Sequence, residues 1–137
     1  MSNTDLEFIS CNFTKNKASK HGGALAIQTL KTVNIINCTF DSNIADNQET
    51  SLSLLSYQNH FDKKKEGRGG ANYINPTFSY HNENDHMKEI NIRNCTFILN
   101  KAFDGFAIYI EGDEPENDFQ ISIIYNEFIN NNQINGD

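Results

Sequence analysis

The chain has 137 residues, of which 37% are hydrophobic, and its formal net charge is −7. This length suits one domain, and the acidic balance makes nucleic acid and anionic membrane surfaces poor candidates for the main partner. No stretch approaches the roughly 18 consecutive apolar residues of a membrane-spanning helix. The first residues also lack the basic and apolar regions of a secretory signal peptide.

A single phrase, Cys-x-Phe-x-x-Asn-x-Ala, occurs three times along the sequence and begins at Cys11, Cys38 and Cys95. A fourth, incomplete copy keeps only Phe128 and Asn131. A phrase that returns in so short a chain is typical of a solenoid, in which one structural unit stacks on the next. Because solenoids build extended surfaces, surface binding is a better starting hypothesis for function than a catalytic cleft.

The apolar residues alternate along the sequence instead of recurring every three or four positions. Runs of alternating residues, separated by Asn, Gly, Asp and Ser, predict short β-strands. In chain order the alternating pairs are Leu25/Ile27, Val33/Ile35, Cys38/Phe40, Ile90/Ile92, Cys95/Phe97, Ile108/Ile110 and Ile121/Ile123. Several such strands in each repeat predict an all-β parallel β-helix, in which each strand pairs with its counterpart about 4.8 Å away in the next coil.

The predicted number of coils depends on the widest gap between phrases. The core phenylalanines lie 27, 57 and 31 residues apart, and the gap of 57 indicates either a lost phrase or a coil with a large insertion. A glycine motif begins 8 residues after Phe61, as one begins 9 residues after Phe13 and 8 residues after Phe97. We therefore take Phe61 as the core residue of a degenerate coil, in which the repeated phrase is no longer recognisable. This interpretation predicts about five coils, with one inward column formed by Phe13, Phe40, Phe61, Phe97 and Phe128.

The recurring polar residues have structural roles in such a fold. Asn37 and Asn94 interrupt the alternation and are expected at sharp bends, because asparagine tolerates the left-handed backbone conformation. The asparagines after each Phe strand are expected to stack in register and to bond one another through their amides, at Asn16, Asn43, Asn100 and Asn131. Glycines are expected where the backbone needs unusual dihedral angles or close approach, at Gly22, Gly23, Gly69, Gly70 and Gly105.

The three cysteines, Cys11, Cys38 and Cys95, share one slot of the phrase and are expected to stack as small buried residues with free thiols. A disulfide between stacked neighbours is within reach by Cα distance, but parallel Cβ vectors disfavour its torsion. No Cys-x-x-Cys motif and no paired histidines occur in the sequence. We therefore expect neither a metal site nor a cofactor.

Three Asn-x-Thr sequons, at Asn12, Asn37 and Asn94, are candidate glycosylation sites in a eukaryotic secretory setting. Asn12 is the best of them, because it lies between the inward Cys11 and Phe13 and should face outward. The alternative for Asn37 and Asn94 is a purely structural role at the bends.

Two polar stretches, 73–88 and 111–118, are expected to project from the coils as loops. The first is the preferred binding loop, because loops on a rigid scaffold often carry recognition; it contains Tyr73, Phe78, Tyr80, His81 and His86. The alternative is a variable insertion without function. The second has five acidic residues among eight, but its spacing matches no calcium-binding motif, so a solvated loop is preferred. The run from Lys63 to Arg68 is likewise interpreted as a solvated turn.

The segment Phe13-Thr14-Lys15-Asn16, followed by Gly22-Gly23-Ala24-Leu25, resembles the FxxN and GGA[ILV] repeat pair of polymorphic membrane proteins. Those proteins are bacterial autotransporter adhesins, and similar repeats occur in surface proteins of some protists. The resemblance extends from Phe8 to Asn131, although only the first coil has both motifs intact. It implies a right-handed parallel β-helix displayed at a cell surface, with an adhesive or antigenic role.

Three functional hypotheses follow from these observations. The first is a non-catalytic segment of a surface-displayed or secreted protein, located outside the cell or on its surface, that contacts a protein or glycan partner. The second is a structural solenoid that joins a larger assembly through its open ends, since isolated coil ends expose strand edges. For the same reason we expect the chain to be part of a longer protein or to be capped by partners. The third, a degenerate carbohydrate-active enzyme, is disfavoured because no pair of carboxylates at a defined separation is identifiable, so no catalytic residue is expected.

Overall fold

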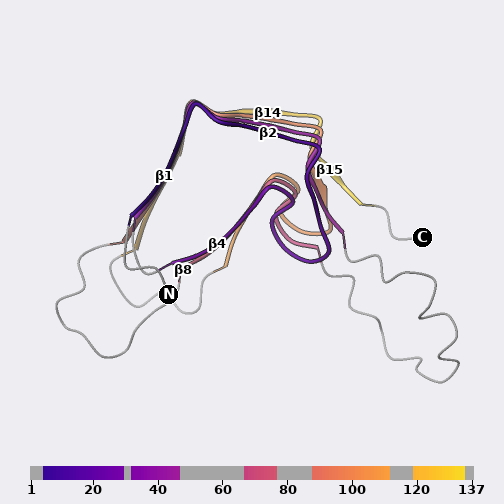
Figure 1. The fold of residues 1–137 in the computed structure, drawn as a ribbon, viewed down its shortest axis with the longest axis horizontal. Coiled ribbons are helices and arrows are strands. Elements are labelled where there is room, and N and C mark those ends of the chain that lie inside the picture. Colours follow the sequence, from indigo (N-terminus) through magenta and orange to yellow (C-terminus); the bar gives the residue numbers. More distant parts are fainter. Residues whose placement is uncertain (1–4, 30–31, 47–66, 77–87, 112–118, 135–137) are drawn as a thin grey trace, which may run out of the picture.

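The structure of the chain, a computed structural model, describes residues 5–29, 32–46, 67–76, 88–111 and 119–134. The described strands form four sheets, and successive turns of the chain superimpose when they are viewed down the stack (Figure 1). Every pairing is parallel and joins a strand to its counterpart in the neighbouring coil. The chain is therefore a parallel β-solenoid, which confirms the fold class predicted from the alternating apolar residues.

Each of the first three coils contributes one strand to each of the four sheets, and the fourth coil contributes a described strand to three of them. The first coil contains β1 (Leu6–Ile9), β2 (Asn12–Thr14), β3 (Lys17–Ala18) and β4 (Leu25–Thr29). The second contains β5 (Val33–Ile36), β6 (Thr39–Asp41), β7 (Ile44–Ala45) and β8 (Asn72–Pro76). The third contains β9 (Lys88–Arg93), β10 (Thr96–Ile98), β11 (Lys101–Ala102) and β12 (Ile108–Ile110). The fourth contains β13 (Phe119–Ile124), β14 (Glu127–Ile129) and β15 (Asn132–Gln133).

The predicted count of about five coils is wrong, because the described strands belong to four. Phe40 of β6 pairs directly with Phe97 of β10, and β4 pairs directly with β8, so no coil separates these strands. The long gap in the sequence is instead an insertion within the second coil, between β7 and β8. Phe61 falls in that insertion and lies outside the described residues.

The predicted phenylalanine column is confirmed for its four described members. The rings of Phe13, Phe40, Phe97 and Phe128 stack nearly parallel, with successive centroids 4.9, 4.9 and 5.0 Å apart. Phe40 and Phe97 are fully buried, whereas Phe128 is 53% exposed because no described coil covers it. Val33, Ile35, Ile90 and Ile92 are buried in the interior beside this column.

Residues other than glycine adopt left-handed backbone at two corners of every coil. At the first corner Asn37 and Asn94 have φ angles of 55° and 52°, as predicted, and Ser10 and Tyr125 take the equivalent places. At the second corner the left-handed residues are Lys15, Ser42, Leu99 and Asn130, each immediately before a ladder asparagine. The ladder asparagines themselves therefore turn inward, where Asn43 and Asn100 are fully buried.

The predicted asparagine ladder is present. The Nδ2 groups of Asn16, Asn43 and Asn100 each donate to Oδ1 of the next asparagine, at 2.9 to 3.0 Å. The backbone N–H of each donor residue bonds the same Oδ1, at 2.9 to 3.0 Å. Every Nδ2 group from the second coil onward also donates to the Phe carbonyl of the coil before, for example Asn43 to Phe13 at 2.9 Å. The ladder thus has one direction, from donor in one coil to acceptor in the next.

The glycine pairs allow the turns of neighbouring coils to approach each other closely. A Cβ atom at Gly23 would lie 2.1 Å from the carbonyl oxygen of Gly70, and one at Gly70 would lie 1.9 Å from that of Phe106. Only glycine fits where another coil's turn lies directly above. Phe106 occupies the same slot in the third coil, where no described turn covers it, and it is partly exposed.

Candidate functional site

Two regions of the described surface contain clustered side chains that do not belong to the repeated phrase. The outer cluster consists of His21, Arg68, Tyr73, Tyr109 and Glu111, on the outer face of the sheet β4–β8–β12. The coil-end face consists of the apolar side chains left uncovered at the end of the stack, which are Phe106 of the third coil and Ile121, Ile123 and Phe128 of the fourth.

The outer cluster begins as a stack of rings along the solenoid. Tyr73 and Tyr109 are paired neighbours in β8 and β12, and their rings stack with centroids 5.9 Å apart. The His21 ring stacks on the other side of Tyr73 at 4.3 Å. This covering leaves Tyr73 only 8% exposed. The predicted loop 73–88 therefore needs correction at both ends, because Tyr73 is a covered strand residue and Lys88 begins β9.

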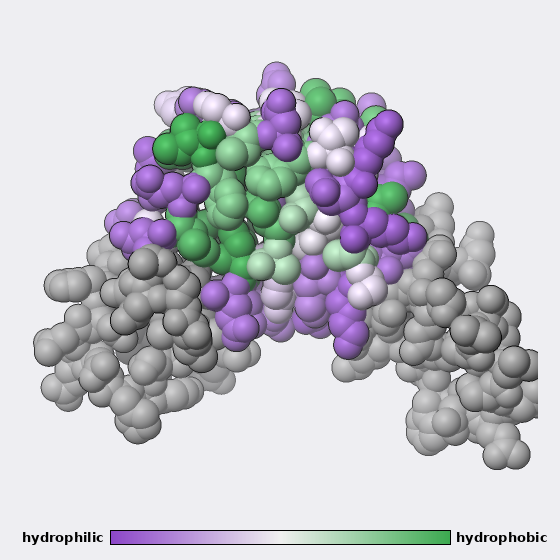
Figure 2. Space-filling model, viewed as in Figure 1, coloured by the Kyte–Doolittle hydropathy of each residue, from purple (hydrophilic) through white to green (hydrophobic). Residues whose placement is uncertain are grey.

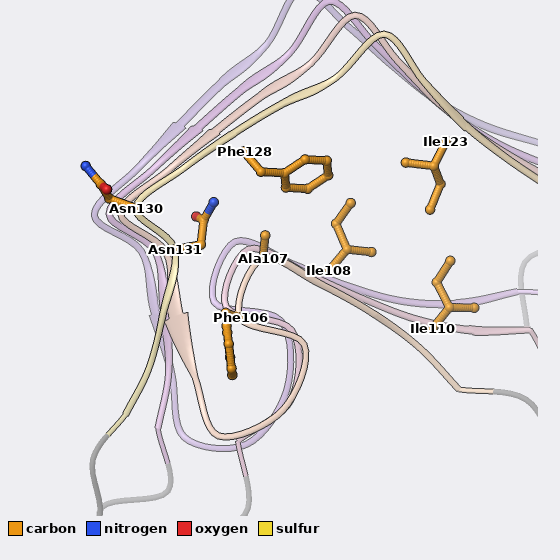
Figure 3. Close-up of a pocket in the computed structure, with 8 residues that line it drawn as sticks. All are labelled: Phe106, Ala107, Ile108, Ile110, Ile123, Phe128, Asn130 and Asn131. Atoms are coloured by element: carbon orange, nitrogen blue, oxygen red, sulfur yellow. The ribbon is translucent and has the colours of Figure 1, made fainter.

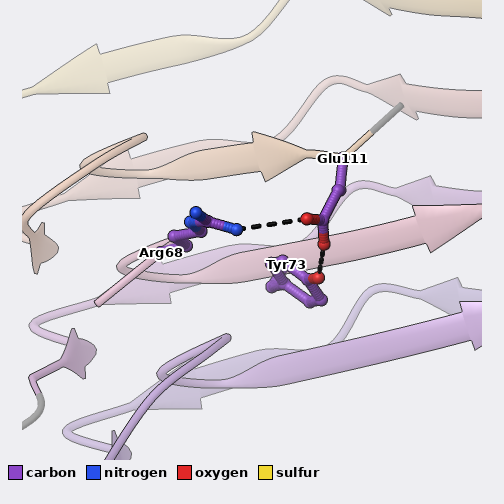
Figure 4. Close-up of polar contacts among 3 residues, drawn as sticks. All are labelled: Arg68, Tyr73 and Glu111. Atoms are coloured by element: carbon purple, nitrogen blue, oxygen red, sulfur yellow. Dashed lines mark hydrogen bonds and ion pairs between the residues drawn. The ribbon is translucent and has the colours of Figure 1, made fainter. Parts of the chain in front are cut away.

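The polar part of the outer cluster joins the second coil to the third (Figure 4). Arg68 Nη1 lies 3.1 Å from Glu111 Oε1, and the Tyr73 hydroxyl donates to Glu111 Oε2. The Arg68 guanidinium also lies 5.2 Å from the centroid of the Tyr109 ring. A partly exposed pair of this kind contributes about 1 kcal/mol or less by itself, but one contact on each carboxylate oxygen fixes where Glu111 lies.

The sequence interpretation missed Arg68 and Glu111, since it placed both in solvated segments. A signal for Arg68 was present. His21, Arg68 and Asp104 each stand immediately before the first glycine of a turn, and their backbones form bridges in one column. No comparable signal marks Glu111, because its partners lie 38 and 43 residues away in the sequence.

The cysteines lie where the phrase places them. Cys38 and Cys95 are buried, Cys11 is partly buried, and all three thiols are free. Cys38 Sγ donates to the Phe8 carbonyl at 3.3 Å, and Cys95 Sγ donates to the Ile35 carbonyl at 3.4 Å. Burial raises the pKa of both thiols above the ordinary value of 9.0. A raised thiol pKa favours an inert structural cysteine.

The raised thiol pKa values lead to a prediction about alkaline stability and labelling. Above pH 9 the unfolded chain loses its thiol protons first, while folded Cys38 and Cys95 keep theirs. The folded state then holds more protons than the unfolded state, so the free energy of unfolding should fall as pH rises beyond about 9. Urea titrations of the Cys38→Ala/Cys95→Ala double variant should show a smaller decline over the same range. In the native Cys11→Ser variant, iodoacetamide should label the remaining thiols only at the rate of unfolding; immediate labelling would contradict their burial.

The candidate glycosylation sites are accessible. Asn12 is exposed on β2, and Asn37 and Asn94 are exposed at their bends. In the described residues, no group of three His, Cys, Asp or Glu side chains could hold a metal ion. The described part of the chain likewise contains no helix long and apolar enough to cross a membrane.

The coil-end face is the interior of the solenoid left open. Ile121 and Ile123 are 46% and 40% exposed, whereas their partners in the coil before, Ile90 and Ile92, are buried. An open end of the stack shows a continuous apolar patch within a hydrophilic rim (Figure 2). A hollow of about 590 Å³ lies at the last coil, lined by Phe106, Ala107, Ile108, Ile110, Ile123, Phe128, Asn130 and Asn131. Phe128, Ile123, Ile108 and Ile110 point into this hollow, and Asn130 points away from it (Figure 3).

The fourth coil has no described strand above β12, so the hollow lies where the other coils continue into their fourth side. The arrangement offers apolar contact and unpaired strand edges rather than groups for proton transfer. Comparison with protein families, curated proteins and solved structures gives no match for the chain.

Proposed function

We propose that the chain is a non-catalytic β-solenoid segment of a surface-displayed or secreted protein, and that it contacts a protein or glycan partner through loops at one corner. The observation that carries this proposal is the position of the strands that flank those loops. β8 and β12 precede the segments 77–87 and 112–118, and they pair in register, with Ile74 beside Ile110. β9 and β13 follow the same segments and also pair in register.

Because paired strands are about 4.8 Å apart, the two segments start and end on adjacent coils. The expected recognition residues of the first segment, Phe78, Tyr80, His81 and His86, lie outside the described residues, as does the acidic run after Glu111. Their attachment points nevertheless bring both segments to one corner of a rigid scaffold. Loops presented in this way commonly carry recognition.

The outer cluster supports the proposal by fixing one of these attachment points. Glu111 is the last described residue before the acidic run, and Arg68 and Tyr73 of the second coil hold its carboxylate. This contact holds the residue that follows β12, where the chain leaves the third coil, against the second coil. It also engages both carboxylate oxygens in structural contacts, which favours a non-catalytic role for Glu111 over the alternative of a degenerate carbohydrate-active enzyme.

The resemblance to polymorphic membrane protein repeats supports surface display, and the exposed sequon at Asn12 is compatible with it. A glycan found on Asn12 in material from the natural source would strengthen this part of the proposal. A structural role in a larger assembly is the second candidate function, and the open coil-end face is the observation that favours it.

Replacing residues 79–86 by a Gly-Ser linker of equal length should abolish retention on whichever immobilised glycan or matrix protein retains the unmodified chain. The matched control replaces residues 52–59, in the insertion after β7, because the described residues that flank this insertion are Asp46 and Gly67 rather than the ends of β8, β9, β12 and β13. We expect the control to bind like the unmodified chain. Equal binding by the 79–86 variant, with an unchanged thermal melt, would contradict the proposed role of this corner.

A further inference from the structure

The direction of the asparagine ladder makes the two ends of the solenoid chemically different. Asn131 accepts from Asn100 through Oδ1 and donates to the Phe97 carbonyl, which leaves its backbone N–H and its second Nδ2 hydrogen without an acceptor among the described residues. Asn16, at the other end, donates to Asn43, and its Oδ1 accepts no bond from the described part of the chain. The last coil thus presents donors where the first coil presents an acceptor.

The apolar columns have the same complementarity. Phe128 carries an uncovered ring face at the end of a stack whose members are about 5 Å apart. Phe13 begins that stack and is only partly buried. The next ring after Phe128 would continue the stack if it belonged to a coil with the sequence of the first.

We propose that the coil-end face binds the first coil of a second copy of this chain, head to tail. In that junction Asn131 donates to Oδ1 of Asn16 of the second copy, and Asn16 Nδ2 of the second copy donates to the Phe128 carbonyl. These are the bonds that join every pair of coils inside the chain. A tail-to-tail contact would instead place donors of Asn131 against donors of Asn131.

The registers of the sheets carry across such a junction without conflict. Continuing them brings Leu6, Phe8 and Ile9 of the second copy beside Ile121, Ile123 and Ile124. Glu7 would meet Ser122, and Lys17 would meet Asn132, so the charged residues do not face like charges. Exposed Ile9 and Ile124, two of the large apolar residues on the outside, would cover each other.

Phe106 explains why the junction places no glycine turn directly on the turn of the third coil. A turn stacked on the third coil in the usual register would place its carbonyl about 2 Å from the Cβ of Phe106, as the values for Gly23 and Gly70 indicate. The junction therefore uses three sides of the coil. On the fourth side, Phe106 and the hollow lie where the fourth coil has no described strand.

The proposal predicts an open-ended, unbranched assembly, because a head-to-tail contact between unlike faces does not close on itself. Sedimentation velocity and light scattering of the unmodified chain should show mass rising with concentration, and electron microscopy should show rods. Phe128→Asp blocks the coil-end face and should weaken association by about 100-fold or more, since an unpaired carboxylate would be buried there.

A second variant blocks the opposite face. Leu6 and Ser10 donate their backbone N–H groups to the second coil, so the N–H of Glu7 points to the free edge. Glu7→Pro removes that N–H without breaking a backbone bond inside the chain, and the one side-chain bond it removes is the exposed 3.5 Å contact from Asn34 Nδ2 to Glu7 Oε1. Each variant alone should be monomeric, and an equal mixture should form a dimer and nothing larger. If either variant loses its β-sheet circular dichroism, Ile121→Lys and Ile9→Pro test the same two faces.

Several results would overturn the proposal. They are a monomeric unmodified chain at every concentration, a blocked variant that associates like the unmodified chain, or a mixture that forms no dimer. Association by Glu7→Pro but not by Phe128→Asp would show a tail-to-tail contact instead. None of these results depends on the loops at residues 77–87 and 112–118, so the outcome is separate from that of the proposed adhesive function.

Discussion

Replacing Phe97 by aspartate is expected to abolish cooperative folding of the chain. Phe97 is fully buried, and its ring lies between Phe40 and Phe128 at centroid distances of 4.9 and 5.0 Å. Loss of a buried phenylalanine by itself costs about 3 to 5 kcal/mol. The buried carboxylate adds several kcal/mol, and the total approaches the whole stability of a domain of this size, about 5 to 15 kcal/mol. Circular dichroism during urea and thermal titration measures the outcome.

Phe128→Asp is the matched control for this prediction, because it makes the same chemical change in the same column. Phe128 is 53% exposed, so its carboxylate remains in water and the chain should stay folded. A Phe97→Asp chain that melts cooperatively near the temperature of the control would contradict the position of Phe97 inside the coil.

Replacing Asn100 by leucine should lower the free energy of unfolding by at least about 3 kcal/mol. Four polar groups lose a bond, three of these bonds are buried, and each loss of a buried bond costs about 1 to 3 kcal/mol. Asn100 Oδ1 accepts from the backbone and the side chain of Asn43. Its Nδ2 donates to the Phe40 carbonyl and to Asn131 Oδ1. Leucine has the same branched shape, although it is larger, and it can form none of these bonds.

Asn132→Leu provides the comparison for Asn100. Asn132 is exposed on β15, and among the described residues its side chain bonds only the neighbouring Asn130 carbonyl, so the substitution should change stability by about 0.5 kcal/mol or less. Urea denaturation curves of the two variants should therefore differ clearly in their midpoints. Similar midpoints for both would show that the ladder contributes little to stability.

The sequence alone determined the repeating parts of this protein. Phe13, Phe40 and Phe97 recur with cysteines and asparagines at fixed offsets, and a fixed offset corresponds to one position on a coil whatever the length of the intervening segment. The inward column, the bends at Asn37 and Asn94, and the ladder could be predicted for this reason. The number of coils could not be predicted, because an inserted segment and a degenerate coil both appear as a long gap in the sequence. The pairing of Phe40 with Phe97 decided between these two possibilities.

The tertiary structure decided everything that depends on contacts between residues outside the repeat. Arg68 and Glu111 are 43 residues apart and meet only because the second coil stacks on the third. Tyr73 is covered for the same reason, although its polar surroundings in sequence indicated a loop. The coil-end face also arises from stacking, since Phe97 and Phe128 occupy the same position in the repeat and differ only in whether a coil lies above them. Local patterns determine the side of the coil that each residue faces, and the order of the coils determines which of those faces remain open.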